Sequence, residues 1–360
     1  MLRRTRFVCI SDTHGYTPSD AGFKLPAGDV LIHAGDLTNN GSMTELCRTM
    51  DWISQADFET KIIVAGNHDV TLDSDFYAKH GYVFHGDRLE DPTQCLEIIT
   101  GSTPSVVLLQ HQAAVIRLTR PEGPNTVFKV FGSPYSQFRG NWAFGYETSD
   151  AVALWDQIPS DTDIVVTHTP PRSHCDQKPN AQSVGCVALR QALSRIRPPL
   201  AICGHVHEGR GYDRVRWRAA LIGNGLDEVE RVTRGVLPPK GSKKQSLVDL
   251  TGKRGECLQN RGFSHAVPGT HGTSATGPTS ETSAGSSAGG GPKQGLEPFD
   301  VPALGADSHG PGPVLQTLRR ETCIVNAAIL ATSWPHRGGK RFNTPIIVDL
   351  ALPVRQVEDD

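Results

Sequence analysis

The tetrapeptide Gly204-His205-Val206-His207 follows the apolar run LAIC at 200–203. A short apolar run of this kind is typical of a buried strand, so the tetrapeptide is predicted to open the loop after that strand. Side chains two positions apart on a strand project to the same face, so both imidazoles can reach one site. The pair alone is weak evidence, because two neighbouring surface histidines are commoner than a metal site.

Similar arrangements occur four more times along the chain, each directly after an apolar stretch. The two histidines of the first tetrapeptide have a counterpart in Asp12-Thr13-His14, which shows the same spacing of two. The other three are Gly35-Asp36, Gly66-Asn67-His68-Asp69 and His168. Five strand ends that each carry Asp, Asn or His are therefore interpreted as one site.

Composition limits the classes of partner. The 360 residues carry 36 Lys and Arg against 38 Asp and Glu, a net charge of −2, which gives no overall electrostatic case for a nucleic-acid or membrane partner. No apolar run reaches the roughly 18 residues of a membrane span, and the basic start lacks the long apolar region of a secretory signal. The eight cysteines are scattered without a CxxC motif, so we expect free thiols in a cytoplasmic protein.

Short apolar strands alternate with helices over the first two hundred residues, which indicates the α/β class. Strands are expected at 5–12, 29–34, 61–65, 163–167 and 200–203, and helices at 44–55, 150–157 and 185–196. A short helix at 76–80 is expected to lead into a short strand at 81–84. The segment 95–131 is predicted to be rich in strands, at 95–100, 106–109, 114–118 and 126–131. A final hairpin is expected from 215–217 and 219–222.

The composition changes after residue 232. Residues 270–294 are almost wholly Gly, Ser, Thr, Ala and Pro, which cannot bury enough apolar surface to offset the entropy of ordering. Residues 233–315 are therefore predicted to be a disordered insertion. Strand-like runs return at 322–330 and 345–349, and they are too short to form a domain alone. We expect 316–360 to complete the domain that 1–232 begins.

The five motifs in this order, DxH, GD, GNHD, an apolar run plus His, and GHxH, resemble the signature of the calcineurin-like metallophosphoesterases. Within that superfamily the chain is most similar to the metallophosphoesterase-domain-containing group, relatives of class III cyclic-nucleotide phosphodiesterases. The further matches are DVLIHAGD at 29–36, THTPP at 167–171, HCD at 174–176, GHVHEGRG at 204–211, IVNA at 324–327 and PIIVD at 345–349. The resemblance implies a catalytic domain built as a two-sheet sandwich flanked by helices (αββα).

Carried over residue by residue, the resemblance implies two metal ions. One would be held by Asp12, His14, Asp36 and His207, and Asp36 would bridge to a second held by Asn67, His168 and His205. A carboxylate can bridge two cations, while neutral imidazoles and an amide carbonyl add no further negative charge. A mixed nitrogen and oxygen donor set accepts divalent or mixed-valence transition metals, with Mn, Fe or Zn expected here.

The resemblance also assigns a catalytic group that is not a ligand. His68 is expected to face the phosphate, and Asp69 is expected to orient His68. The expected reaction is hydrolysis of a phosphodiester, cyclic nucleotides included, by a hydroxide that the metal pair activates. A phosphomonoesterase or nuclease would keep every ligand, and a non-catalytic scaffold is the rival from another class. No DNA-binding domain or basic stripe is visible, so a small phosphoester is the expected partner, and the oligomeric state stays open.

Other residues have a structural interpretation beside the functional one. His33 lies inside a strand and is expected to be a packed core histidine. Arg172 and His174 either contact phosphate or form an exposed loop pair, and both readings stay open. The aromatic residues Tyr135, Phe138, Trp142 and Phe144 are expected to form a structural cluster rather than to flank a base. The basic pairs Lys243-Lys244 and Lys253-Arg254 are expected to be solvated.

Overall fold

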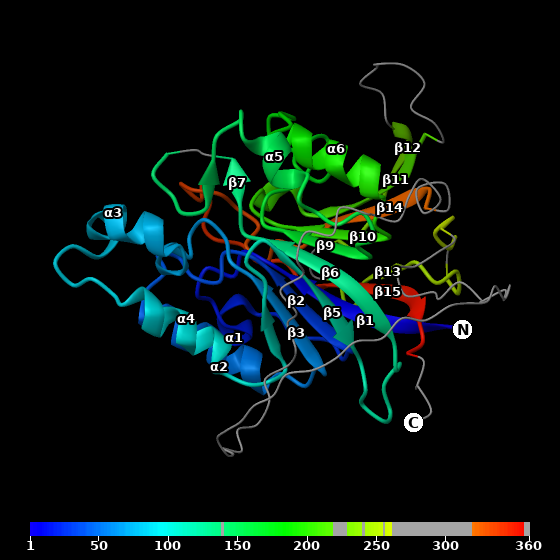
Figure 1. The fold of residues 1–360 in the computed structure, drawn as a ribbon, viewed down its shortest axis with the longest axis horizontal. Helices are drawn as coiled ribbons and strands as arrows, with labels where there is room; N and C mark the ends of the chain where they lie inside the picture. Colours follow the sequence, from blue (N-terminus) through cyan, green and yellow to red (C-terminus); the bar gives the residue numbers. More distant parts are fainter. Residues whose placement is uncertain (138–139, 219–228, 240–241, 255, 261–318, 356–360) are drawn as a thin grey trace, which may run out of the picture.

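Two β-sheets form the centre of the structure, a computed structural model that describes residues 1–137, 140–218, 229–239, 242–254, 256–260 and 319–355 (Figure 1). The strands are β1 (Leu2–Ile10), β2 (Val30–Ala34), β3 (Thr60–Val64), β4 (Val106–Leu108), β5 (Gln112–Arg117), β6 (Val127–Ser133), β7 (Ser136–Gln137), β8 (Gly145–Tyr146), β9 (Ile164–Thr167), β10 (Leu200–Cys203), β11 (Gly211–Trp217), β12 (Val229–Arg234), β13 (Ser246–Asp249), β14 (Glu321–Asn326) and β15 (Ile346–Pro353). The first sheet has the order β13-β15-β1-β2-β3-β4, and the second has the order β12-β11-β14-β10-β9-β6-β5. Strands β7 and β8 pair separately.

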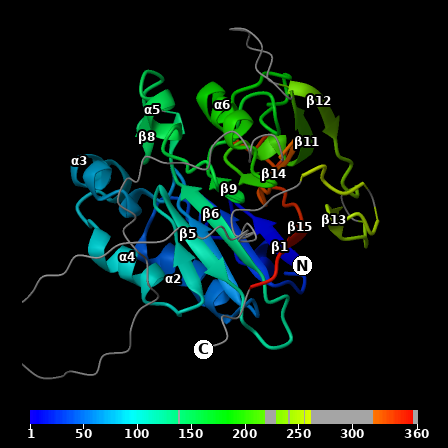
Figure 2. The ribbon, with the colours of Figure 1, turned by 45° about the vertical axis from the view of Figure 1, so that its right-hand side comes forward.

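Helices cover the outer faces of the two sheets. They are α1 (Pro18–Ala21), α2 (Met43–Gln55), α3 (Ser74–His85), α4 (Pro92–Thr100), α5 (Ala151–Trp155) and α6 (Val187–Ile196), with 3-10 turns η1 (Val70–Leu72) and η2 (His207–Gly209). In both ribbon views α2 and α4 lie on the side of the first sheet, and α5 and α6 lie on the side of the second (Figures 1 and 2). The αββα arrangement predicted for the chain is therefore confirmed.

The alternation of side chains along β1 shows why the layers form. Phe7 and Cys9 belong to the core between the two sheets, whereas Val8 and Ile10 belong to the core between the first sheet and its helices. Successive strand residues point to opposite faces, so a strand that is apolar at every position is buried on both sides. A third core lies between the second sheet and the helices α5 and α6.

The parallel strands carry the predicted motifs to one edge. β1, β2 and β3 are parallel neighbours in the first sheet, and β9 and β10 are parallel neighbours in the second. Each motif follows the last residue of one of these strands, and the carboxyl ends of parallel strands meet at the same edge of a sheet. The fold therefore gathers three of the motifs at one edge of the first sheet and two at one edge of the second.

The C-terminal strands lie inside the sheets. β14 runs parallel to β10 and antiparallel to β11, while β15 pairs with β1 and β13. The guanidinium of Arg6 donates from Nε and Nη2 to the two carboxylate oxygens of Asp349, at 2.7 and 2.8 Å, and so ties β1 to β15. A bidentate pair of this kind is among the stronger polar contacts in proteins.

Two predicted strands are helical. The strand expected at 95–100 is wrong, because this segment forms α4, where the Asp91 side chain caps the first turn and Pro92 is the first helical residue. The strand expected at 81–84 is also wrong, because α3 continues through it to His85. Short apolar runs fit a helix as well as a strand. At 95–100 the helix packs Cys95 and Ile99 into the core, whereas Tyr82 and Val83 of α3 are exposed, so packing does not explain the helix at 81–84.

The range predicted as a disordered insertion, 233–315, contains an ordered strand. Ser246–Asp249 forms β13, which runs parallel to β15 at the edge of the first sheet, so the prediction is wrong for this segment. The segment is ordered because Leu247 and Val248 pair with β15, and composition alone does not reveal this pairing. Residues 261–315 lie outside the described residues. β11 does form a hairpin, with β12 as its partner, while the expected partner at 219–222 lies outside the described residues.

Two smaller features complete the description. Along the described chain, no helix combines the length and the apolar character needed to cross a bilayer. All eight cysteines are free thiols, as predicted, and only Cys47 and Cys257 are exposed.

We predict that a chain ending at residue 318 does not fold. It would lack β14 and β15, and their neighbours would be left with unpaired backbone groups that favour aggregation. Circular dichroism melting and size-exclusion chromatography would show an aggregated protein without a cooperative transition. A control chain ending at Arg355 keeps both strands and should melt like the full chain. Cooperative melting of the shorter chain would contradict the interior position of these strands.

Candidate metal centre

Three groups of His and Asp side chains could hold a metal ion at the strand ends. In each group the ligand atoms lie within 4.8 Å of one another. The groups are Asp12 with His14 and His207, Asp12 with Asp36 and His168, and His14 with Asp36 and His68. Any two of the groups have one residue in common, which is Asp12, His14 or Asp36. The three groups therefore form one continuous cluster rather than three sites.

The first half of the cluster gathers around the end of β1. The Nε2 atoms of His14 and His207 lie 3.2 Å apart. His207 Nε2 lies 3.3 Å from Asp12 Oδ1, and His14 Nε2 lies 3.6 Å from Asp36 Oδ2. Two imidazole nitrogens and two carboxylate oxygens thus converge from β1, β2 and β10.

The second half gathers around His168. Its Nε2 atom lies 3.3 Å from Asp36 Oδ1, 3.0 Å from Asn67 Oδ1 and 3.2 Å from His205 Nδ1. Asp36 therefore presents Oδ2 to the first half and Oδ1 to the second. A carboxylate that turns one oxygen to each of two donor groups is positioned to bridge two cations.

Glycines make this close approach possible. A Cβ at Gly66 would overlap the Asp36 carboxylate, and one at Gly204 would overlap the Asp12 carboxylate. A Cβ at Gly35 would overlap the His168 ring, and Gly35 also has a φ of +97°. These glycines are the ones in the GD, GNHD and GHxH motifs, so the motifs need them for steric reasons as well as for backbone freedom.

The backbone at the site is strained. Asp12, His14, Asp36 and His205 all have positive φ, at 53°, 46°, 55° and 65°. Residues other than glycine adopt this left-handed region at a cost of about 1–3 kcal/mol each. The surrounding sheets therefore hold four cluster side chains in orientations that the isolated chain disfavours, which is a common property of functional sites.

The buried carboxylates of the cluster are stabilised by positive charge on neighbouring groups. Burial opposes charge on Asp12, but the hydrogen bond and charge of His207 lower the pKa of Asp12 to about 2. Burial also acts against protonation of His168, yet Asp36 raises the pKa of His168 to about 9. The pKa of His207 is likewise raised to about 9 by Asp12, against the effect of burial. Two buried carboxylates thus draw positive charge to the two imidazoles that face them.

The other two histidines resist protonation. Burial lowers the pKa of His14 to about 3, and burial together with the charge of His168 lowers the pKa of His205 to about 3. His14 and His205 are therefore neutral and available as ligands near pH 7. Divalent cations would satisfy the carboxylates in place of the protons on His168 and His207, and all four rings would then bind as neutral imidazoles.

Backbone carbonyls orient two of the rings for this role. His168 Nδ1 lies 3.0 Å from Ala34 O, and His207 Nδ1 lies 3.0 Å from Thr332 O. A ring that donates its Nδ1–H to a carbonyl keeps Nε2 as the free acceptor, which is the usual arrangement of metal-binding histidines. The donor set, its glycine cradle and this outer shell fit a pair of metal ions.

Comparison with known proteins agrees with this geometry. The sequence profile described as Calcineurin-like phosphoesterase matches residues 5–209, more than half of the 360 residues. The chain belongs to the calcineurin-like phosphoesterase family. The family predicted from the five motifs is confirmed.

Relatives of the chain share a similar stretch. Metallophosphoesterase domain-containing protein 1 of Homo sapiens is 34% identical over 213 residues, 58% of this chain and 62% of that protein. A UPF0046 protein of Caenorhabditis elegans is 34% identical over 206 residues, 57% of this chain and 64% of that protein. A protein of Emericella nidulans named "Probable rhamnogalacturonate lyase C" is 39% identical over 214 residues, 59% of this chain and only 18% of that protein. The chain spans less than two thirds of each of these relatives.

His68, expected to be a catalytic group and not a ligand, lies next to His14 and Asp36 and forms one of the three groups with them. Its backbone N–H donates to Asp36 Oδ1 at 2.9 Å, and its ring lies edge to face with His14 at a centroid distance of 4.7 Å. Trp142 stacks on the same ring, with centroids 3.9 Å apart and planes inclined by 35°. Nδ1 of His68 lies 2.7 Å from Asn39 O. The ring is thus held on several sides.

Asp69 does not play the part predicted for it. Its carboxylate accepts hydrogen bonds from the backbone N–H groups of Gly66, Leu37 and Thr38, at 2.8 to 3.2 Å, and from the Thr38 hydroxyl. It therefore joins the loops after β2 and β3, while the contact with the His68 ring comes from Asn39 O. The reason is that Asp69 is fully buried below the loop and faces its backbone.

The remaining predicted residues divide into packed and exposed groups. His33 is buried and bonded to Thr13, which confirms a core histidine. His174 is buried against Asp213, whereas Arg172 is exposed, so the two do not form a pair. Tyr135 and Phe144 pack in the core as predicted, and Phe138 lies outside the described residues. Both basic pairs, Lys243-Lys244 and Lys253-Arg254, are exposed as predicted.

Sequence reasoning missed three contacts that shape the site. Asn39 and Thr332 act through backbone carbonyls, which leave no trace in residue type. Trp142, expected in a structural cluster, packs against Phe84, and its stacking on His68 also places it at the site. The run of aromatic residues marks the loop that contains Trp142, but the sequence does not show that this side chain packs on His68.

We predict that Asp36→Asn lowers the number of metal ions bound per chain. An amide oxygen carries no charge and its nitrogen is no acceptor, so the two halves of the cluster would lose their shared ligand. Elemental analysis after gel filtration in Mn²⁺ would measure the loss. The matched control is Asp57→Asn, because the Asp57 side chain is 90% exposed and pairs with Arg120. Full metal content in Asp36→Asn would contradict the bridging role.

Proposed function

We propose that this chain is a metal-dependent phosphodiesterase that acts on small phosphoesters, cyclic nucleotides included. The observation that supports it most is Asp36, whose two carboxylate oxygens face different groups of donors. One ion would be held by Asp12, His14, Asp36 and His207, and the other by Asp36, Asn67, His168 and His205. A pair of transition-metal ions in such a site supplies Lewis acidity that makes a water more acidic and neutralises charge on the phosphate oxygens.

The chain's own residues supply orientation and a proton. Nδ1–H of His68 donates to Asn39 O, which leaves Nε2 to carry the transferable proton of the protonated ring. The stacked indole of Trp142 and the edge of His14 hold the plane of that ring beside the cluster. A group placed in this way can donate its proton to the leaving oxygen of a phosphoester.

A small substrate fits the charge of the chain better than a nucleic acid does. The net charge is −2, so the long-range field gives a polyanion no general attraction. The positive charge of the site would be local and would come from the metal ions that Asp12, Asp36 and the histidines hold. We therefore propose a small phosphoester as the partner and no nucleic acid.

The test compares a chromogenic diester with the matching monoester. Full-length protein loaded with Mn²⁺, Fe²⁺ or Zn²⁺ is expected to hydrolyse bis(p-nitrophenyl) phosphate faster than p-nitrophenyl phosphate. His68→Gln should keep its metal content and lose about 10²–10⁴ in kcat, the usual contribution of a general acid. His80→Gln on α3 serves as the control.

Each of the other outcomes would point to a different function or residue role. A preference for the monoester would make the chain a phosphomonoesterase. Two bound ions without turnover of either ester would favour a scaffold without catalysis. Loss of metal in His68→Gln would show that His68 is a ligand.

A further inference from the structure

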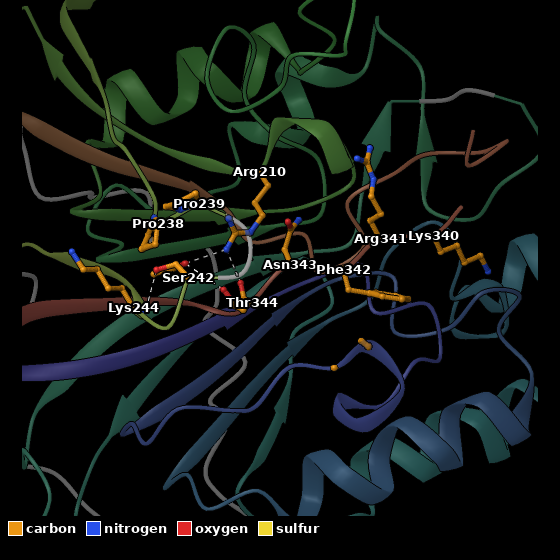
Figure 3. A pocket seen from close by; sticks show the side chains of 13 residues that line it. Arg210, Pro238, Pro239, Ser242, Lys244, Lys340, Arg341, Phe342, Asn343 and Thr344 are labelled. Carbon is orange, nitrogen blue, oxygen red and sulfur yellow. Dashed lines mark hydrogen bonds between the residues drawn. The ribbon is translucent and has the colours of Figure 1, made fainter. Parts of the chain in front are cut away.

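A cavity of about 490 Å³ lies apart from the candidate ligands (Figure 3). Its wall is built by the end of α1, by Arg210 just before β11, and by the segment 340–344 that leads to β15. Further residues of the wall are Pro238, Pro239, Ser242, Lys244 and Ser246. None of the seven predicted metal ligands lines it. It is therefore a second concave site of a size typical for small-molecule pockets.

Four basic residues line the cavity, and Arg210 is partly buried while Lys244, Lys340 and Arg341 are exposed. The Nη2 atom of Arg210 donates to Thr344 O at 2.6 Å and lies 3.4 Å from Ser246 Oγ. Its Nε–H is buried and has no acceptor among the residues that the structure describes. Figure 3 shows the guanidinium directed towards Thr344, and dashed lines mark its hydrogen bonds. The guanidinium is thus fixed through Nη2 and can still donate a hydrogen bond from Nε.

No carboxylate balances this cation within the described residues. The cavity wall contains neither Asp nor Glu. The acidic residues closest in sequence are engaged elsewhere: Glu208 accepts from the backbone N–H and hydroxyl of Ser333, both at 3.1 Å, and Asp213 lies 3.3 Å from Arg234 Nε. Arg210 is therefore a partly buried cation without a protein counter-ion.

Such a cation is costly to bury. Burial is the sole cause that lowers the pKa of Arg210 to about 10, so the guanidinium remains charged near pH 7. A charge removed from water without a partner raises the free energy of the folded state. An anion in the cavity would offset this cost and would meet little competition from the protein.

The rest of the wall suits the phosphate of a small molecule. The hydroxyls of Ser242 and Thr344 add donors to the wall, and Pro238, Pro239 and Phe342 add non-polar surface (Figure 3). Lys340 extends away in the same view, where its Nζ donates to Tyr16 OH at 2.6 Å. A single fixed guanidinium with hydroxyls fits one phosphate group rather than an extended polyanion.

We propose that this cavity binds the phosphate group of a small phosphorylated molecule or of inorganic phosphate, with Arg210 as its principal contact. The site is separate from the metal centre, so it does not depend on the proposed phosphodiesterase activity. Ser242 and Thr344 complete the contacts to the phosphate, and the two prolines with Phe342 face whatever the phosphate carries.

The test is isothermal titration of the full-length, metal-loaded chain with inorganic phosphate and with phenyl phosphate. Asp36→Asn, which impairs the metal centre, should retain one phosphate site. Arg210→Gln in that background should weaken this binding by about tenfold or more, as expected for a lost charged hydrogen bond. Arg88→Gln removes an exposed arginine and should change nothing. Tighter binding of phenyl phosphate identifies an organic phosphate as the ligand, and equal binding identifies phosphate itself.

A second variant keeps the proposal testable if Arg210→Gln does not fold. Ser242→Glu places a carboxylate in the wall and leaves the contacts of Arg210 with Thr344 and Ser246 intact. It should abolish phosphate binding and remove the rise in melting temperature that phosphate causes. Phosphate binding that survives both Arg210→Gln and Ser242→Glu would overturn the proposal. So would the absence of any phosphate binding in Asp36→Asn with Arg210 intact.

Discussion

Two buried carboxylates, Asp12 and Asp36, are the constraint on which the rest of the site depends. They lie at the ends of neighbouring parallel strands, where water cannot stabilise their charge. Positive charge must therefore come from the cluster itself, and it falls on His168 and His207, the imidazoles that face the carboxylates. Metal ions satisfy the same demand with more charge in less space. The left-handed backbone of the cluster residues and the glycines beside them allow these groups to approach one another closely.

The sandwich explains how two sheets supply one centre. β1, β2 and β3 bring the carboxylates and Asn67, and β9 and β10 bring three of the histidines. The C-terminal strands connect the halves, because the residues after β14 reach both sides: Ile329 N donates to Ser11 O, and Thr332 O lies beside His207 Nδ1. A segment more than three hundred residues from β1 in sequence thus contacts both the β1 and the β10 side of the candidate metal centre.

How much of this was predictable depends on the kind of contact. The cluster residues could be read from sequence, because apolar runs mark buried strands and parallel strands end at one edge. The apolar residues of α4, Cys95, Ile98 and Ile99, fit either period, and the helix-start signal Asp91-Pro92 is what favours a helix there. β13 was hidden by its polar and glycine-rich surroundings. Carbonyl contacts such as Asn39 with His68 depend on backbone path, so residue types cannot reveal them.

The central claim is that one cluster binds two ions through a shared Asp36, and anomalous scattering tests it most directly. Crystals grown with Mn²⁺ and measured above the metal absorption edge should give two anomalous peaks about 3.5–4 Å apart. The Asp36 carboxylate should lie between them, with Asp12, His14 and His207 around one peak and Asn67, His168 and His205 around the other. A single peak, or two peaks that do not share Asp36, would contradict this account.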